Sequence, residues 1–138
     1  MTDGIMMDTL QQARDFFQND RFATENGMTI RDASQRHALI GLVLTGTHRN
    51  AAGSVMGGVL FTMADFACAV AANFGSGTGL HVSADANVRF LRPCSGGTLA
   101  AEAICVKHGD KLSFYDVSIS DETGAEIAAA SFTMCRVK

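Results

Sequence analysis

The stretch from Gly57 to Phe74 reads GGVLFTMADFACAVAANF and is apolar almost throughout. It approaches the roughly 20 residues that a helix needs to span a bilayer. It carries Asp65 near its middle, however, and no basic residues flank it as anchors. A carboxylate at the centre of a membrane span costs on the order of 2.5–3.5 kcal/mol. The stretch therefore predicts a helix buried inside a globular domain, hydrophobic nearly all round and small enough in side chain for a sheet to close on it.

Periodicity on either side of this helix predicts the remaining elements. An amphipathic helix is expected over Ile5–Phe22, because Met6, Leu10, Ala13 and Phe17 recur at helical spacing. Strands are expected over residues 27–32, 37–45, 80–91, 98–107, 111–120 and 125–137. In residues 80–91, strict alternation places Val82, Ala84, Ala86, Val88 and Phe90 on one face, and His81, Ser83, Asp85, Asn87 and Arg89 on the other.

The order of these elements predicts an α+β fold. Strands joined by short hairpins can form an antiparallel sheet that curls around the central helix, with one face of the sheet packed on it. The 138 residues lie within the usual size of one domain, so we expect a single domain over 1–138, with an N-terminal helical segment over 1–25.

Composition limits the function classes. The hydrophobic fraction is 47% and the formal net charge is −3, so a nucleic-acid partner is not expected. The four cysteines have no CxxC and no zinc-ligand spacing, and the histidines have no metal-site spacing. The N-terminus, MTDGIMMDTLQQ, lacks the pattern of a signal peptide. We expect a cytoplasmic protein with free thiols, no metal, no cofactor and no membrane association.

Three features that could carry chemistry coincide around the start of the central helix. Gly57 and Gly58 at the helix start leave backbone N–H groups free to bind a carbonyl oxygen that becomes negative in a reaction. Asn50 is a neutral side-chain donor just upstream. Asp65 is a carboxylate in an otherwise apolar helix, and such a group costs free energy unless it is paired or functional.

Spacing along the helix constrains how these groups could act together. Asp65 follows Gly57 by eight residues, which is about 12 Å along a helix at the usual rise per residue. One carbonyl group cannot contact both on the same helix. If both act on one substrate, they come from two subunits, so the spacing predicts a dimer with its active sites at the interface.

The stretch HRNAAGSVMGGVLFTMADFACAVAAN, over residues 48–73, resembles the signature of the hotdog-fold thioesterases of the phenylacetate-degradation (PaaI) type. That pattern runs H-x-N-x-x-G-x-x-H-G-G, with Asp or Glu eight residues after the first glycine of the pair. The resemblance continues through residues 83–93, 108–114 and 121–124 and covers about 26–137. It implies an antiparallel sheet around a long helix, a homodimer or a dimer of dimers, and hydrolysis of an acyl-CoA thioester.

The resemblance also implies roles for individual residues. The Gly57 N–H and Asn50 would polarise the thioester carbonyl. Asp65 of the partner subunit would activate water or attack as a nucleophile, and Ser83 would orient that water. His48 matches the motif and is interpreted as structural.

Further residues are candidates for binding the substrate. Met56, Gly58, Phe61 and Phe90 are candidates for the acyl pocket and its rim. The phosphates of CoA need cations, for which the candidates are Arg89, Arg92, Lys107 and Lys111, expected to cluster around two strands and their turns.

One departure from the family pattern leaves alternatives open. Met56 stands where the family has histidine, and methionine does not form strong hydrogen bonds. The backbone N–H of Gly57 is unaffected, so a thioesterase is the first hypothesis. A non-catalytic acyl-CoA binder or sensor on the same fold is the second. A hydratase or dehydratase acting on an enoyl or hydroxyacyl thioester is the third, although Met56 removes the obvious catalytic histidine.

Overall fold

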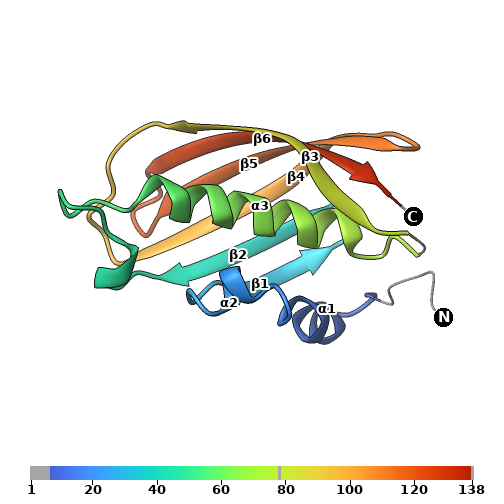
Figure 1. Cartoon of the computed structure of the whole chain (residues 1–138), viewed down its shortest axis with the longest axis horizontal. Helices are drawn as coiled ribbons and strands as arrows, with labels where there is room; N and C mark the ends of the chain where they lie inside the picture. The colour runs from blue at the N-terminus through green and yellow to red at the C-terminus, as the bar shows by residue number, and fades with distance from the viewer. Residues whose placement is uncertain (1–6, 78, 138) are drawn as a thin grey trace.

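An antiparallel sheet wraps around one long helix in the computed structural model of the chain (Figure 1). The structure describes residues 7–77 and 79–137. Its elements are, in order, α1 (Leu10–Phe17), α2 (Arg21–Thr24), β1 (Thr29–Ser34), β2 (His37–Val43), the 3-10 helix η1 (Gly46–His48), α3 (Gly57–Asn73), β3 (His81–Phe90), β4 (Thr98–His108), β5 (Leu112–Asp121) and β6 (Glu126–Arg136). The arrangement expected from the sequence is confirmed.

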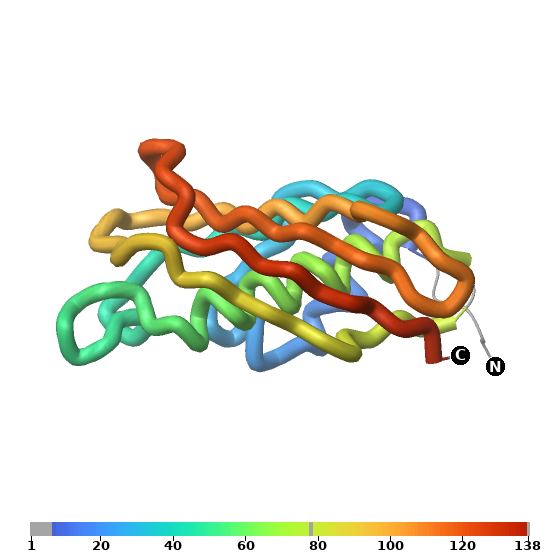
Figure 2. The backbone as a smooth tube through the Cα atoms, turned by 90° about the horizontal axis from the view of Figure 1, so that it is seen from above, coloured from blue at the N-terminus to red at the C-terminus, as the bar shows by residue number. Residues whose placement is uncertain are grey.

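The six strands lie in the order β1-β2-β4-β5-β6-β3, and every neighbouring pair is antiparallel. The hairpins β4–β5 and β5–β6 form the centre of the sheet, whereas β3 lies at one edge and pairs with β6 (Figure 2). Each of four strand pairs has one register shift, in β1, β3, β4 and β6. Such bulges bend and twist a sheet, which suits a sheet that curves around a helix.

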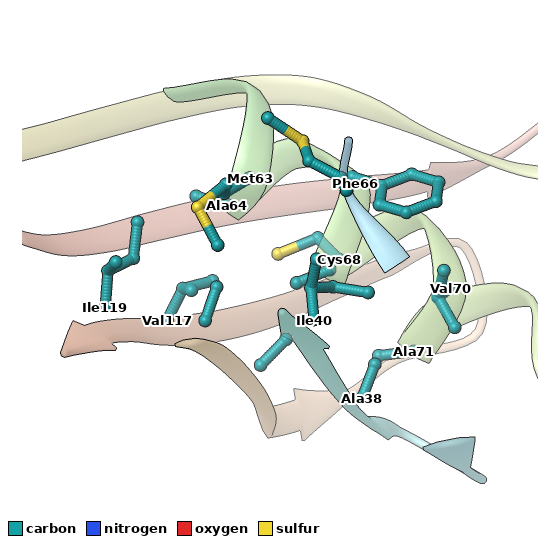
Figure 3. Close-up of a cluster of buried hydrophobic side chains, with 14 of the residues drawn as sticks. Ala38, Ile40, Met63, Ala64, Phe66, Cys68, Val70, Ala71, Val117 and Ile119 are labelled. Atoms are coloured by element: carbon teal, nitrogen blue, oxygen red, sulfur yellow. The ribbon is translucent and has the colours of Figure 1, made fainter. Parts of the chain in front are cut away.

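The α3 helix is buried along most of its circumference, and the face with Gly58, Phe61 and Asp65 is exposed or partly buried. Ala64, Ala67 and Ala71 are fully buried, and their small side chains let the helix approach the sheet closely. Figure 3 shows α3 residues facing Ala38 and Ile40 of β2. On another side, the ring of Phe66 meets Phe17 of α1 edge to face, with centroids 5.9 Å apart.

The N-terminal segment forms two short helices in place of one helix over Ile5–Phe22, so that prediction was wrong in extent. A capping box starts α1 at Leu10, because the side chains of Thr9 and Gln12 each accept the other's backbone N–H. After α1, Asn19 donates its side-chain N–H to the carbonyl of Phe16 at 3.0 Å, which ends the helix. Ile5 and Met6 lie outside the described residues.

The predicted alternation of β3 was also wrong, because a bulge at Ala84 interrupts it. Ser83 is opposite Met134 and Asp85 is opposite Thr133, so Ala84 is the extra residue. After the bulge, Ala86 and Val88 pack against the core. Before it, the hydroxyl of Ser83 reaches Asp65 of α3, and the backbone of the buried His81 is bonded to the side chain of Asn73. The bulge therefore changes which face the early residues of β3 occupy.

Candidate active site

The loop before α3 holds Asn50 in a fixed orientation. Its Oδ1 accepts the backbone N–H groups of Ala52, at 3.0 Å, and Ser54, at 3.1 Å. Two N–H donors on one atom identify that atom as the amide oxygen. The Nδ2 group of Asn50 is thereby left as a donor for a ligand.

His48 ties this loop to the rest of the fold. Its ring is buried, and Nδ1 accepts the backbone N–H of Thr45 at 3.0 Å. Since Nδ1 accepts, Nε2 carries the proton and donates to the carbonyl of Asn26 at 2.7 Å. Its own carbonyl accepts the N–H of Met56 at 2.9 Å, so His48 positions the residue that caps α3.

The start of α3 exposes backbone donors beside a hollow. Met56 is the N-cap residue, forms no side-chain cap and is 56% exposed. As the first two residues of the helix, Gly57 and Gly58 have no intrahelical acceptor for their N–H groups. A Cβ added to Gly57 would lie 3.1 Å from the ring of Phe90.

The hollow at this end of α3, here called the Gly57 hollow, has a volume of about 350 Å³. Its lining combines the helix start, the preceding loop and the end of β3: Asn50, Ser54, Val55, Gly57, Leu60, Phe90, Leu91, Arg92, Pro93, Cys94 and Ile127. The predicted carbonyl-binding groups, Asn50 and Gly57, therefore share one concave site.

Asp65 lies in the middle of α3 and is partly buried. The hydroxyl of Ser83 on β3 donates to its Oδ1 at 2.6 Å, a short charge-assisted hydrogen bond. The bulge at Ala84 makes this contact available, because it leaves Ser83 on the helix side of the strand. Within one chain, Ser83 therefore contacts the Asp65 carboxylate directly, whereas its predicted role of orienting a water stays a prediction.

A second hollow, here called the Asp65 hollow, has a volume of about 370 Å³. It lies between α2 and α3 and is lined by Asp20, Arg21, Phe22, Ala23, Phe61, Thr62, Asp65 and Phe66. Phe61, a predicted pocket residue, lies here with its ring 5.7 Å from that of Phe132. Asp20 and Phe22 were not predicted from the sequence. One continuous helix was expected through this segment, so the turn that brings these two residues to α3 was not expected.

Asp65 also affects the ionisation of its neighbours. Partial burial, and secondly the negative charge of Asp65, raise the pKa of Asp20. Burial together with the charges of Asp65 and Asp116 raises the pKa of the Cys68 thiol. Cys68 is therefore unreactive, and all four cysteines are free thiols.

The two hollows do not merge in the chain. Gly57 lines one and Asp65 lines the other, and no residue is common to both linings. Eight residues of continuous helix separate the two positions, or about 12 Å. The structure thus brings together Asn50 with Gly57, and Asp65 with Ser83, but keeps the two pairs apart.

The predicted cationic cluster does not form within the chain. Arg92 lines the Gly57 hollow, whereas Arg89 lies on the outer face of the sheet beside Glu102 and Asp116. The carbonyl of Lys111 accepts the N–H of Arg136 at 2.8 Å, near the opposite end of β3 from Arg89. The antiparallel register is the reason, because it sends the β4–β5 turn to the C-terminal end of α3.

That end of α3 has a polar hollow of about 290 Å³, whose lining includes Arg36, His81, His108 and Arg136. Among the described residues, Nδ1 of the buried His81 has no hydrogen-bond partner. Burial, and then the nearby His108 and Arg136, lower the pKa of His81. Asn73 fixes the backbone of His81 through two hydrogen bonds.

Across residues 7–77 and 79–137, no three side chains of His, Cys, Asp or Glu lie together in a way that could hold a metal ion. No helix in that part of the chain is long and apolar enough to cross a membrane.

Comparison with known proteins decides the family. Residues 52–128, more than half of the chain, match the thioesterase superfamily. The chain belongs to the thioesterase superfamily. Its fold is the hotdog fold, and the resemblance noted in the sequence is confirmed.

Individual relatives of this thioesterase superfamily member support the assignment. The acyl-coenzyme A thioesterase PaaI of Escherichia coli K12 is 32% identical over 120 residues, covering 86% of this chain and 84% of that protein. The solved structure of the E. coli PaaI protein from the phenylacetic acid degradation operon superimposes with a TM-score of 0.86 at 29% identity, covering 93% of this chain and 92% of that one. Zebrafish thioesterase superfamily member 2 shares the fold, with a TM-score of 0.83 at 20% identity over 94% of this chain and 99% of its own.

Proposed function

We propose that this chain hydrolyses acyl-CoA thioesters to CoA and the free acid, in an active site assembled from two subunits. The observation that carries the proposal is the hydrogen bond of 2.6 Å between Ser83 and Asp65 on an otherwise apolar helix. Family membership supports the reaction class. The separation of the two hollows supports the two-subunit site.

One subunit would bind the thioester carbonyl. The Gly57 N–H and the Nδ2 group of Asn50 would donate hydrogen bonds to its oxygen, and these bonds strengthen as negative charge develops there. The partial positive charge at the start of α3 acts in the same direction. Because the loop already holds Asn50 through its Oδ1, no reorganisation of the amide is required.

The other subunit would supply the carboxylate. As a general base, Asp65 of the partner subunit would take a proton from the water that attacks the carbonyl carbon. The carbon–sulfur bond then breaks, and the proton passes to the CoA thiolate. As a nucleophile, the same carboxylate would attack the carbon itself, the carbon–sulfur bond would break, and the CoA thiolate would leave and take a proton from solvent. Water would then hydrolyse the mixed anhydride, releasing the free acid and regenerating the carboxylate. In both routes Ser83 holds the carboxylate through its hydroxyl.

The edge of the sheet supports dimerisation. Within the described part of the chain, β3 pairs with β6 along one side and has no strand along the other. An edge strand of this length presents unpaired N–H and C=O groups that favour pairing with another chain. We propose that a second copy pairs here, giving a homodimer with two sites, and that two such dimers can associate.

The position of Arg92 supports a contact with a CoA phosphate, because it lines the same hollow as Asn50 and Gly57. Arg89 and Lys111, being elsewhere, would reach a phosphate only across an interface. CoA belongs to the substrate, so the proposed reaction requires no cofactor.

Thiol release from aryl-, short-chain and medium-chain acyl-CoAs tests the reaction, with wild type compared to Asp65→Asn. We expect release that falls by about 10²-fold or more in the variant. The free cysteines of the chain give a background signal, which a no-substrate reaction subtracts.

No release from any thioester by folded wild-type protein would instead support an acyl-CoA binding protein. The observation that favours this second candidate is Met56, which is half exposed at the start of α3 where an imidazole would otherwise be available. If the chain is such a binding protein, Met56→His should raise the rate of hydrolysis sharply. If the chain is already a thioesterase, the same substitution should raise the rate only modestly.

A further inference from the structure

The Asp65 hollow is the natural place for the acyl group of the proposed substrate. Its volume of about 370 Å³ falls in the usual range for small-molecule pockets. The aromatic rings of Phe22, Phe61 and Phe66 line it, and the carboxylate proposed to act on the thioester lies in the same wall. An acyl chain attached to a carbonyl beside Asp65 would therefore extend between these rings.

This hollow carries a second carboxylate. Asp20, at the N-cap of α2, lines it opposite α3 and makes no capping hydrogen bond with its side chain. Asp20 and Asp65 line the same hollow, and burial, followed by the negative charge of Asp65, raises the pKa of Asp20. Two carboxylates in one partly apolar hollow produce a negative potential there.

The one cation in the lining does not cancel this potential. Arg21 is largely exposed and forms an ion pair with Glu25, one helical turn further along the chain. Since Glu25 compensates Arg21, the net charge that faces the hollow remains that of Asp20 and Asp65.

We propose that Asp20 is a specificity-determining residue that excludes acyl groups ending in a carboxylate, so that the enzyme selects uncharged acyl-CoAs. This inference rests on the proposed function. A carboxylate at the far end of the acyl chain would enter the hollow beside Asp20 and be repelled. A methyl or phenyl end of similar size would instead pack against Phe22 and Phe61.

Two substrates of matched length test the proposal: hexanoyl-CoA and adipyl-CoA, which share a six-carbon acyl group and differ in the terminal carboxylate. The measured quantity is the ratio of kcat/KM for adipyl-CoA to that for hexanoyl-CoA. Using a ratio cancels the contribution of the CoA charges. Asp20→Asn keeps the size of the side chain and should raise the ratio about tenfold.

Asp15→Asn is the matched control. It removes the same charge from the same segment, but Asp15 lies on the exposed side of α1, where it accepts a hydrogen bond from Gln11, and does not line the hollow. Its ratio should equal that of wild type. A second readout is the dependence on salt. Raising the salt concentration screens the repulsion, so the wild-type ratio should rise, and the Asp20→Asn ratio should rise less because only the charge of Asp65 is left in the hollow.

The outcomes separate this inference from the proposed function. A ratio that is the same in wild type and Asp20→Asn, with both enzymes active on hexanoyl-CoA, overturns the role of Asp20 and leaves the thioesterase proposal standing. An equal rise in Asp15→Asn also overturns it, because overall charge would then explain the effect. If wild type hydrolyses no acyl-CoA, the proposed function fails first and the inference fails with it.

Discussion

Asn50 performs two tasks with the two ends of one side chain. Its oxygen holds the loop by accepting N–H groups from Ala52 and Ser54, and its nitrogen is the proposed donor to the substrate. Asn50→Asp removes only the second role. An ionised carboxylate still accepts the N–H groups of Ala52 and Ser54, but it has no proton to donate to the substrate carbonyl. We expect kcat/KM to fall by about 10²–10³-fold, as for other losses of one oxyanion donor.

Thermal unfolding of the same variant provides the control for Asn50. Because the loop hydrogen bonds persist, the melting temperature should stay close to that of wild type, whereas Asn50→Ala should lower it. If Asn50→Asp retains full activity, the amide is not a donor to the carbonyl.

His81 connects pH to stability through its burial. Its pKa is lowered in the folded chain, first by burial and then by His108 and Arg136. The unfolded chain therefore binds more protons than the folded chain as the pH falls through about 6.5, the ordinary pKa of histidine. The free energy of unfolding should decrease between pH 7.5 and 5.5, and urea denaturation at several pH values measures it.

The variant His81→Gln isolates this contribution, because glutamine does not titrate. Its stability should depend less on pH over the same interval than that of wild type. Thr123 and the Gly97 N–H lower the pKa of Asp121 and Glu122, respectively, but carboxylates lose their contribution only as pH falls toward 4 and below. An unchanged slope in His81→Gln would exclude the imidazole as the cause.

At the scale of the element, the two glycines that open α3 are not equivalent. A Cβ at Gly57 would lie 3.1 Å from the Phe90 ring, whereas a Cβ at Gly58 would meet nothing within 4 Å among the described residues. Gly58→Ala should therefore raise the free energy of unfolding by up to about 1 kcal/mol, the usual gain of alanine over glycine in a helix. Gly57→Ala should raise the free energy of unfolding by less, because the Phe90 ring must move to make room for the added methyl group.

Chemical denaturation of the two variants compares them directly. An equal gain at both positions would show that the Phe90 ring does not restrict Gly57. Activity gives a separate readout, since Gly58 lies beside the proposed carbonyl site and a methyl group there could obstruct the substrate without harming the fold.

Elements with a strong pattern could be predicted from the sequence, and local exceptions to a pattern could not. The apolar run of α3 and the hairpin turns between β4, β5 and β6 indicated the architecture, because a mostly buried helix and tight turns leave direct compositional signals. The bulge at Ala84 left none, since it depends on the register of β6. Asp65 stood out as a carboxylate in an apolar helix, whereas Asp20 is an ordinary polar residue until the turn after α1 brings it to the same hollow.

At the scale of the whole molecule, the two-subunit site predicts complementation between inactive variants. A heterodimer of one Asp65→Asn chain and one Asn50→Asp chain contains one site with both residues intact and one with neither. Purified through two different tags, it should show about half of the wild-type activity per dimer, although each parent homodimer is nearly inactive.

The alternative arrangement gives the opposite result. If Asp65 and Asn50 of the same chain acted on one substrate, every site in the heterodimer would lack one of them, and activity would remain at the level of the parents. Light scattering on the same samples confirms that a dimer formed.

The sheet order also governs how the chain can acquire its structure as it is synthesised. The partner of β3 within the chain is β6, which leaves the ribosome only after β4 and β5. Until then the almost uniformly apolar α3 has no closed sheet around it, and β3 has both edges free. Nascent chains in this state expose apolar surface and unpaired strand edges, which favour aggregation. Variants that slow translation or weaken β6 should therefore reduce soluble yield and increase chaperone dependence, even where the finished protein is stable.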